Sequence, residues 1–467
     1  MSSGPAKLAR PAGDFRVIAR GKLNDQRIQG AIDLSMNRLR DLRLAAWDAL
    51  GEGEVEALRD RAHAIRMRVI DDLEGHLAQF TVALEARGGK VHRAATAEEA
   101  QQIIVRLCQE KGAKLVAKSK SMATEEISLN DGLEAAGMQV VETDLGEYIL
   151  QLRGEHPVHI VAPAIETTKE QVSEMFSAIE GREIPAELDA LAASARRQLR
   201  EVFLAADVGI SGCNMAVAET GSITLVTNEG NGRLVTSLPR THIAVMGMER
   251  LVPTLDDLSV ILRLLARSGT GQRLTSYTTV ITGPRRAGEA DGPEELHVVV
   301  LDNGRTNLLR GRYKEMLACI RCSACLNVCP VFKKTGGTAY GPVYSGPMGA
   351  VLVPLYLGLG GAPDLPHASS LCGACTEACP VKIPLHELLL DLRRDLVDER
   401  VVPWWERAAF TAWSLAWSSP LGYRVSTRLA RAGQRWGAAA GPGRAWGTGR
   451  ALPQLARRRY RDRHNRG

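Results

Sequence analysis

Seven of the nine cysteines of this 467-residue chain lie between residues 319 and 379. They form two runs, and each run ends in a Cys-Pro pair. The first run holds Cys319, Cys322, Cys325 and Cys329, and the second holds Cys372, Cys375 and Cys379. Iron in a sulfide cluster favours thiolate ligands, and the CxxCxxCxxxCP spacing of the first run is typical of proteins with two neighbouring clusters. The two runs therefore predict two iron–sulfur clusters.

The Cys-Pro thiols indicate how the seven ligands divide between the clusters. In this motif three closely spaced cysteines bind one cluster, and the fourth binds its neighbour. Cluster one is therefore expected to take Cys319, Cys322, Cys325 and Cys379, and cluster two to take Cys329, Cys372 and Cys375. A pair of structural zinc sites is the alternative, but zinc motifs rarely combine CxxCxxC steps with a closing Cys-Pro.

The second run is one cysteine short, and Ser369 stands where its leading cysteine would be. Three states of cluster two remain open. It is [4Fe–4S] with the Ser369 oxygen or water on the fourth iron, [3Fe–4S] without that iron, or [4Fe–4S] with a ligand from elsewhere in the chain. The spare thiols, Cys108 and Cys213, sit in apolar patterns and are expected to be buried structural cysteines.

Alternating strand and helix patterns precede the cysteine runs. A polar, partly helical lead-in covers residues 1–63, and apolar residues at helical spacing from Ile65 predict a helix that ends before Gly88-Gly89. Apolar strands and amphipathic helices then alternate. The expected strands are 90–93, 115–117, 140–141, 159–162, 215–218, 222–227, 234–237, 242–246, 277–282 and 297–301. This order favours an α/β domain over residues 64–303 with a parallel sheet covered on both faces.

Polar side chains gather at the ends of these strands. Such positions in open α/β sheets are where ligands bind, although glycines and asparagines also serve turns and charges are often simply solvated. The candidate ligand pocket comprises Lys118, Lys120, Glu219, Asn228, Glu229, Asn231, Arg233 and His242. Glu219 is the candidate nucleophile or base if the α/β domain is itself a catalyst of acyl, CoA or sugar-phosphate chemistry. The sequence has no GxGxxG loop, Walker motif or HExxH motif.

The charge of the chain is uneven. The net charge is +6, but residues 403–467 hold thirteen arginines, no lysine and two acids, which makes +11 there and −5 in the rest. Six of the seven tryptophans lie in the same segment, and several follow one helical stripe. That pattern favours packing against a partner or a core, with attachment to an anionic membrane surface as the alternative. No fold that binds nucleic acid is recognisable, so nucleic acid is not an expected partner.

The start of the chain has no secretory leader, and no stretch approaches the roughly 20 apolar residues that span a bilayer. With clustered thiols, this favours a reducing compartment and a cytoplasmic protein, or one peripheral to the inner face of the membrane. The apolar run 349–362 is expected to be a packed segment between the cysteine runs. Residues 304–400 are expected to form a helical two-cluster module, and 401–467 a Trp- and Arg-rich C-terminal region.

Several strings of the chain resemble those of the lactate utilization protein B family. They are KSKSMATEEISLN (118–130), VVETDLGEYILQL (140–152), AETGSITLVTNEGNGRLVTSLPRTHIAVMGMERLVP (218–253), TGPRRAGEADGPEELHVVVLDNGR (282–305), CIRCSACLNVCP (319–330) and SLCGACTEACPVKIPLHELL (370–389). The likeness runs from about residue 15 to about residue 430. An α/β domain and a seven-cysteine module follow one another in the family's order.

The resemblance implies a lactate-utilisation domain with a fold similar to the NagB/RpiA/CoA-transferase class, followed by a ferredoxin-like module with two [4Fe–4S] clusters. It also implies an iron–sulfur electron-transfer component that acts with two partner proteins to oxidise L-lactate to pyruvate, so that lactate serves as a carbon source. The family binds its clusters through seven cysteines, so serine at position 369 is no departure. The Arg-rich end beyond about Arg431 inherits no role.

Overall fold

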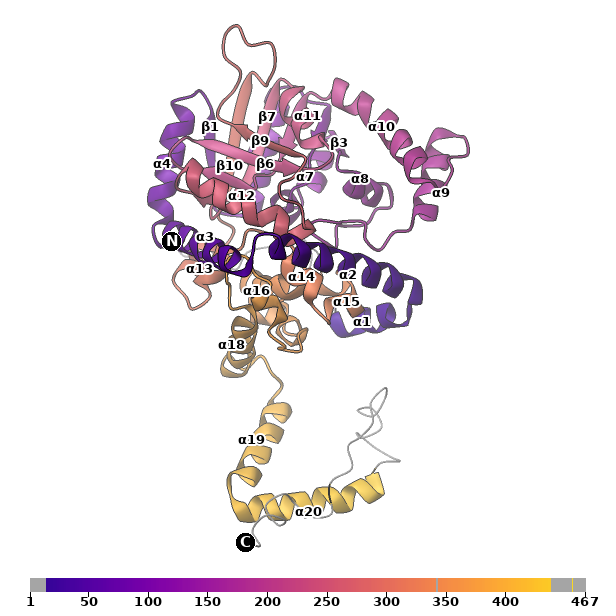
Figure 1. Ribbon diagram of the computed structural model, residues 1–467, viewed down its shortest axis with the longest axis vertical. Coiled ribbons are helices and arrows are strands. Elements are labelled where there is room, and N and C mark those ends of the chain that lie inside the picture. The colour runs from indigo at the N-terminus through magenta and orange to yellow at the C-terminus, as the bar shows by residue number, and fades with distance from the viewer. Residues whose placement is uncertain (1–13, 342, 438–455, 457–467) are drawn as a thin grey trace. The chain divides into compact units, whose positions relative to one another are not determined.

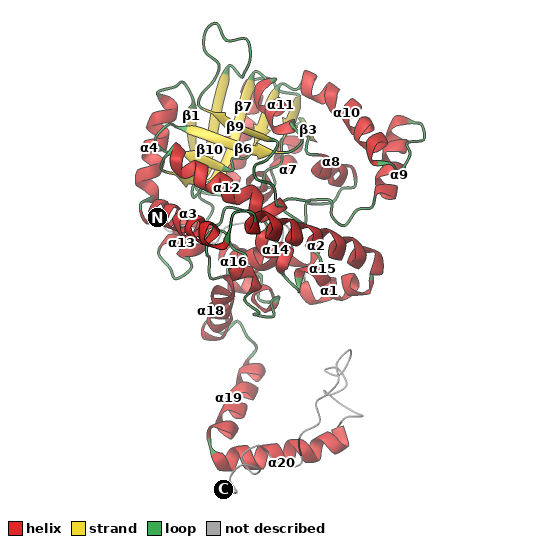
Figure 2. Ribbon diagram, viewed as in Figure 1, coloured by secondary structure: helices red, strands yellow, loops and turns green. Residues whose placement is uncertain are grey.

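The computed structural model describes residues 14–341, 343–437 and 456. The chain forms two units, Met1–Leu396 and Val397–Gly467. Figure 1 labels the helices and strands of each unit, and Figure 2 distinguishes them by type. The first unit contains both cysteine runs and every strand of the described residues.

Four helices form the N-terminal part of the first unit. They are α1 (Phe15–Asn24), α2 (Gln26–Asp48), α3 (Glu52–Asp71) and α4 (Leu73–Glu85). The carboxylates of Asp14, Asp25 and Asp72 accept otherwise free backbone amides at the starts of α1, α2 and α4, which favours the beginning of each helix there. Helix α3 runs without a break through residues 63 and 64, so the boundary expected there falls inside a helix.

A six-stranded sheet forms the centre of the first unit (Figure 1). Its strands stand in the order β1-β10-β7-β4-β2-β3, and every neighbouring pair is parallel. They are β1 (Lys90–Ala94), β2 (Leu115–Lys118), β3 (Gln139–Glu142), β4 (Val208–Ser211), β7 (Thr241–Gly247) and β10 (Glu295–Leu301). The predicted α/β class with a parallel sheet is confirmed. The sequence pattern does not predict β4, because its four residues are all buried and show no alternation.

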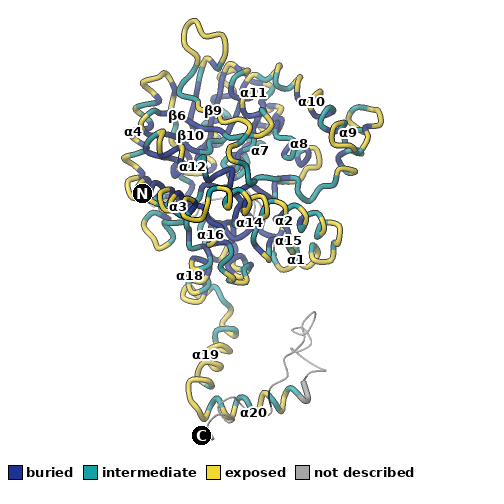
Figure 3. The backbone as a smooth tube through the Cα atoms, in the orientation of Figure 1, coloured by how far each residue is buried: buried dark blue, intermediate teal, exposed yellow. Residues whose placement is uncertain are grey.

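Apolar side chains fill both faces of this sheet. Successive residues of a strand point to opposite faces, so Ile243 and Val245 of β7 lie in one core and Ala244 and Met246 in the other. Helices α5 (Ala97–Glu110), α6 (Met122–Glu126) and α7 (Leu129–Ala135) belong to the first side. Helix α4 and a second sheet cover the other side. Figure 3 shows much of the backbone of the strands as buried, whereas the covering helices are buried only on their inner side.

The second sheet is mixed and has the order β8-β5-β6-β9. Its strands are β5 (Met215–Val217), β6 (Ser222–Thr227), β8 (Leu251–Val252) and β9 (Tyr277–Ile281). Helix α12 (Leu255–Thr270) follows β8 and is capped by Thr254, whose hydroxyl accepts the amide of Asp257 at 3.1 Å.

The strand predicted over 234–237 is wrong. Asn231–Ser237 forms helix α11 instead. Its burial repeats at helical spacing, because Asn231 and Val235 are buried whereas Arg233 and Leu234 are exposed. Gly230 adopts a left-handed φ of 77° that turns the chain from β6 into this helix, which is why the glycine-rich string does not lead into another strand.

The strand predicted over 159–162 is also wrong. His159 Nδ1 accepts the backbone amides of Val161 and Ala162 at 3.2 and 3.0 Å, and a side chain that binds these amides replaces the bonds of a sheet. The irregular segment lies between α8 (Leu145–Leu152) and α9 (Lys169–Glu180). Helices α8, α9 and α10 (Leu188–Ala205) share a small apolar core of their own.

Short helices surround the two cysteine runs. They are α13 (Arg305–Leu309), η1 (Lys314–Ala318), α14 (Ala324–Val328), α15 (Phe332–Thr335), η2 (Thr338–Tyr340), α16 (Gly346–Leu357), η3 (Leu359–Gly361), η4 (Leu365–His367), α17 (Ala374–Glu377) and α18 (Leu385–Asp398). Helix α16 is buried along most of its length, so the apolar run is the packed segment that the sequence predicts. Helices α1 and α2 pack against this module, which joins the N-terminal lead-in to the cysteine runs.

The second unit contains α19 (Trp404–Ser418) and α20 (Pro420–Gly437), which pack against each other. Trp417 is in ring contact with Trp413 and with Tyr423, at 5.1 Å between centroids in each case. The tryptophan stripe is therefore helical, as predicted. Eight of the thirteen arginines, and Trp446, lie outside the described residues. None of the described helices has the length and apolar character that crossing a bilayer requires.

Candidate metal centres and an adjoining cavity

Four of the seven cysteines surround one small cavity, which we name site one. Cys319 and Cys322 lie in the loop after η1, Cys325 lies in the first turn of α14, and Cys379 directly follows Ala378 after α17. All four line the cavity together with apolar neighbours such as Met348. The fold thus brings Cys379 of the second run to three cysteines of the first, as the predicted division requires.

Backbone amides lie against sulfur atoms at both runs. The amides of Arg321, Phe332 and Ile383 lie 3.4 Å from the sulfurs of Cys319, Cys329 and Cys379, respectively. Such donors stabilise the thiolate form that iron binds. Arg321 and Ser323 adopt left-handed φ angles of 57° and 67°, which cost non-glycine residues about 1–2 kcal/mol each. The loop therefore keeps a strained shape where it wraps around the thiols.

The thiols influence one another within two groups. Burial raises the pKa of Cys322, and Cys379 and Cys319 raise it further. Burial likewise raises the pKa of Cys375 to about 11, with contributions from Cys329 and Cys372. Thiols with such high pKa values ionise only when a metal replaces the proton. The residues present thus fit two clusters, divided as the spacing predicts.

Site two comprises Cys329, Cys372 and Cys375. Cys329 and Cys375 are buried, whereas Cys372 is exposed. The neighbouring loop residues Leu371 and Gly373 adopt left-handed φ angles of 53° and 82°. Site two therefore lies nearer to solvent than site one and offers three thiols.

Ser369 occupies the place in site two that Cys319 occupies in site one. In the first run the amide of Arg321 donates to the Cys319 sulfur two residues earlier, and Arg321 is left-handed. In the second run the amide of Leu371 donates to the Ser369 hydroxyl at 3.1 Å, and Leu371 is also left-handed. The two loops thus have the same local geometry, with a hydroxyl in place of a thiol.

Guanidinium groups surround site one. They belong to Arg43, Arg59, Arg66, Arg250 and Arg321, of which four are buried and Arg250 is half-buried. Arg66 donates to the carbonyls of Leu317 and Ala318 at 3.0 and 3.2 Å, directly before the first cysteine. Arg59 donates to the Cys379 carbonyl at 2.9 Å. The backbone that carries the thiols is therefore held by positive side chains.

A buried ionic network continues from these arginines. Arg305 bridges Glu126 and Glu249 at 2.8 and 2.6 Å. Burial alone would raise the pKa of Glu249, but Arg305, Arg250 and Arg321 outweigh it and hold the pKa at about 2. Two carboxylates face three guanidinium groups in this network, which leaves an excess of positive charge beside Cys319.

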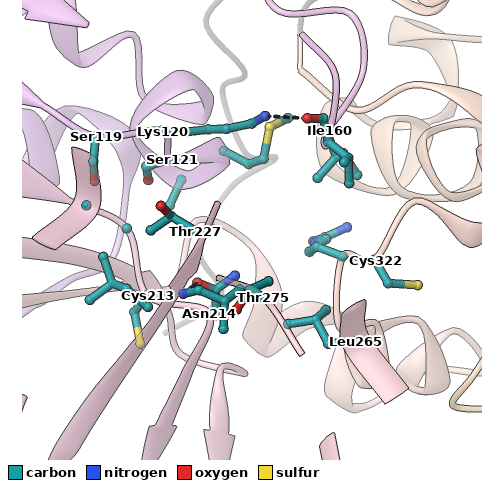
Figure 4. A pocket seen from close by; sticks show the side chains of 18 of the residues that line it. Ser119, Lys120, Ser121, Ile160, Cys213, Asn214, Thr227, Leu265, Thr275 and Cys322 are labelled. Atoms are coloured by element: carbon teal, nitrogen blue, oxygen red, sulfur yellow. Dashed lines mark hydrogen bonds between the residues drawn. The ribbon is translucent and has the colours of Figure 1, made fainter. Parts of the chain in front are cut away.

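A second cavity, of about 250 Å³, lies at the carboxyl ends of three central strands (Figure 4). Residues 119–121 of its wall follow β2, and residues 212–214 follow β4. Gly247 is the last residue of β7, and Glu249 and Arg250 lie just after it. Cys322 of site one lines the same cavity, on the other side from Ser119 in Figure 4. Gly269 of α12 permits this junction, since a Cβ there would lie 2.6 Å from the Cys322 carbonyl oxygen.

Half of the predicted pocket residues meet at this cavity. Lys120, Asn228, Glu229 and Asn231 line it. Asn228 exchanges side-chain hydrogen bonds with Gln272, and Glu229 accepts the amide of Leu145 at 3.0 Å. Burial raises the pKa of Glu229, and neighbouring Asp144 raises it further.

The other four predicted residues, Lys118, Glu219, Arg233 and His242, do not line this cavity. Lys118 is fully buried in ion pairs with Glu125 and Glu142 at 2.8 and 2.7 Å. His242 is buried in β7, where its Nε2 shares a 2.7 Å hydrogen bond with the Ser211 hydroxyl. Ion pairs satisfy the buried Lys118, whereas His242 has one hydrogen bond at Nε2 and no partner at Nδ1 among the described residues.

Arg233 is exposed because it lies on the outer face of helix α11, opposite the buried Asn231 and Val235. Glu219 is exposed and accepts the amide of Leu255 at 2.7 Å, where it satisfies a free donor at the start of α12. Neither residue lines the cavity. A catalytic role for Glu219 therefore finds no support in its surroundings.

Other residues of these sites are not predicted by the sequence pattern. Ser119, Glu249, Arg250 and Arg321 all line the cavity. Arg250 follows a predicted strand by only a few residues, a position that could have indicated it. No local sequence pattern indicates a role for Arg321, because the cysteine motif places no requirement on the residues between Cys319 and Cys322. Cys108 is buried as predicted, whereas Cys213 is half-buried on the cavity wall.

Two family models match the two parts of the first unit. The model of the LUD domain family matches residues 77–301, and that of the 4Fe-4S dicluster domain matches residues 315–383. A crystal structure of a DUF162 family protein from Deinococcus radiodurans covers 49% of this chain and 98% of its own, at 16% identity and a TM-score of 0.28.

Curated relatives match most of the chain. Lactate utilization protein B of Macrococcus caseolyticus is 49% identical and covers 90% of this chain and 88% of its own length. The proteins of that name from Bacillus velezensis and Geobacillus kaustophilus are 48% identical and cover 94% and 96% of both chains. Since 96% of 467 residues is about 448, similarity extends past residue 431, further than the sequence strings indicate.

The fold and the thiol sites define an iron–sulfur protein in which a LUD domain precedes a 4Fe-4S dicluster module. This match decides for iron–sulfur clusters over structural zinc. The chain belongs to the lactate utilization protein B family.

Proposed function

We propose that this protein is the iron–sulfur electron-transfer component of a multi-protein system that oxidises L-lactate to pyruvate. The observation that carries the proposal is the position of site one, whose ligand Cys322 lines both the thiol cavity and the cavity at the carboxyl ends of the sheet. The names of the relatives supply the substrate. A cytoplasmic location, including the inner face of the membrane, accompanies this role.

The seven cysteines would hold two clusters, which when bound accept and donate single electrons. The chain contributes the order of the two sites. Cys375 of site two contributes to the raised pKa of Cys325 at site one, so the sites are near neighbours. Cys372 is exposed, which makes site two the natural point of exchange with a partner.

Two partner proteins of the lactate-utilisation system are part of the proposal. In the second unit, α19 has no buried residue, and Trp404, Trp405 and Trp413 are more than half exposed. Such a helix suits a protein partner or an anionic membrane surface. Liposome flotation of the chain with and without residues 403–467 distinguishes the two alternatives. Equal flotation of both chains would exclude attachment to a membrane surface through this segment.

We propose further that both clusters are [4Fe–4S] and that Ser369 supplies the fourth ligand of cluster two. Its hydroxyl takes the same amide bond that the Cys319 sulfur takes in the equivalent loop. The alternative is a [3Fe–4S] cluster. Ser369→Cys should preserve or strengthen a four-iron signal in the EPR spectrum, whereas Ser369→Ala should convert cluster two to three irons. Identical spectra of the wild-type protein and Ser369→Ala would contradict the proposal that Ser369 is the fourth ligand of cluster two.

The main test is anaerobic reconstitution with the two partner proteins. We expect about eight irons per chain, or seven with a trinuclear cluster two, and an EPR signal that appears when L-lactate is added to the complete system. The protein alone with lactate is the control and should remain oxidised. Zinc without labile sulfide, or lactate oxidation with no change at either cluster, would contradict the function.

A further inference from the structure

The cavity between the sheet and site one contains polar groups whose bonding capacity is not met. Ser119 is 3% exposed, and its hydroxyl has no hydrogen-bond partner among the described residues. A buried hydroxyl left in this state costs about 1–3 kcal/mol. Lys120 donates to the Val161 carbonyl at 3.1 Å, as Figure 4 shows, and forms no ion pair within the part of the chain that the structure describes.

Arg250 adds further donors to the wall of this cavity. It donates to the Cys319 carbonyl at 3.3 Å, and the Glu249 carboxylate lies 3.8 Å from its Nε. A guanidinium group has five N–H donors, so capacity remains for a ligand. Lys120 and Arg250 are carried by different strand ends, and both line the space that Cys322 borders.

We propose that this cavity binds a small monocarboxylate, whose charge pairs with Lys120 and whose remaining polar atoms meet donors such as Ser119 and Arg250. Its volume of about 250 Å³ equals the share of roughly eight water molecules in the liquid, which suits a ligand of up to about ten non-hydrogen atoms. A bound ligand would lie beside Cys322 and therefore beside site one.

The charges around Lys120 favour a monoanion over a dianion. Asp144 and Glu229 line the same cavity, and Lys120 lowers the pKa of Glu229, so these groups lie within electrostatic reach of one another. These two carboxylates of the protein repel a ligand with two negative charges, such as a phosphate dianion, more strongly than a ligand with one. Glu249 adds a third negative group on the wall, although its arginines neutralise it.

Calorimetric titration of the full cluster-containing chain tests the proposal. The probes are acetate, L-lactate, pyruvate and inorganic phosphate. We expect at least one carboxylate to bind more tightly than phosphate, and Lys120→Gln to weaken it by about 10-fold or more, as expected for a lost charge-assisted hydrogen bond. Lys120→Arg should retain binding within a few-fold. Lys169→Gln is the matched control, since Lys169 is an exposed lysine on α9.

A second measurement needs no variant. Lactamide has nearly the shape of lactate without its charge, so it should bind the wild-type protein at least 10-fold more weakly than lactate or fail to bind. Absence of carboxylate binding, tighter binding of phosphate, equal binding of lactamide, or indifference to Lys120→Gln would overturn the proposal. Because cluster reduction is not the readout, each of these results leaves the proposed electron transfer standing.

Discussion

Site one and site two use the same ligand chemistry in different surroundings. Site one has four thiols, several buried guanidinium groups and direct contact with the α/β domain through Cys322. Site two has three thiols, one of which, Cys372, is exposed, and Arg393 approaches it through the Ser369 carbonyl at 2.9 Å. The difference lies in burial and charge rather than in the sulfur ligands.

Such surroundings separate the properties of two clusters. Reduction adds negative charge, and nearby positive groups stabilise the reduced form, which raises the reduction potential. Arg66, Arg250 and Arg321 are all within electrostatic reach of Cys319. We therefore expect site one to have the higher potential and site two to exchange electrons with partners.

The largest expected effect comes from Cys379→Ala, which removes the ligand without offering a hydroxyl in its place. Although Cys379 belongs to the second run, it lines site one, so this variant should lose cluster one and keep cluster two. Iron and labile sulfide should fall by about half. Metal analysis with EPR measures both, and Cys108→Ala, a buried cysteine of α5, is the control. Loss of the site-two signal instead would reverse the division of ligands.

Arg66→Met should destabilise the first unit by about 3–5 kcal/mol, because four backbone carbonyls lose a buried charged donor. Arg393→Met at site two should cost about 1–2 kcal/mol, since Arg393 donates to two carbonyls and is only part-buried. Anaerobic urea unfolding compares them. Equal losses would mean that the arginines do not distinguish the sites.

Arg43→Met should lower the potential of cluster one by on the order of 50 mV, which is about 1 kcal/mol for one electron. Arg43 is buried, its charge interacts with Cys322, and its Nε has no hydrogen-bond partner among the described residues. The change therefore removes mainly charge, together with a contact to the Trp47 ring at 4.8 Å. A redox titration followed by EPR measures both clusters. Cluster two should hold its potential, and Arg38→Met, at an exposed position of the same helix, should change neither.

The last expected effect concerns pH. His159 accepts two amides through Nδ1 and lies 3.3 Å from Asn327 beside the first run, and burial lowers its pKa to about 3. At a pH below the ordinary histidine pKa near 6.5, the unfolded chain therefore binds a proton at His159 that the folded chain excludes. The free energy of unfolding therefore decreases as the pH is lowered. From pH 7.5 to 5.5 this histidine should cost roughly 1.4 kcal/mol.

Urea unfolding at both pH values measures this loss, and His159→Asn should reduce it by that amount. His242 has the same sign, since burial also lowers its pKa to about 3, so part of the pH dependence should remain in the variant. An unchanged pH dependence in His159→Asn would show that His159 is protonated in the folded protein.

The predictable parts of this protein are those that short-range patterns encode. Apolar alternation indicates most strands of the parallel sheet, but not β4, which is buried on both faces. The residues of the pocket could be predicted only in part. Lys118 and Lys120 lie in the same sequence string, yet their side chains reach different surroundings. Lys118 pairs with Glu125 of the same string and with Glu142 of β3, a pairing that the folded sheet creates, whereas Lys120 lines the cavity.

Sequence alone predicted which residues would bind the clusters and how they would divide, because ligand spacing is a covalent property of the chain. Tertiary structure decided what surrounds each cluster. Arg43 and Arg59 from the N-terminal helices and Arg250 from the end of the central sheet meet the cysteines only in the folded protein. Burial and charge depend on the distances between such residues, and those distances follow from packing rather than from any local pattern.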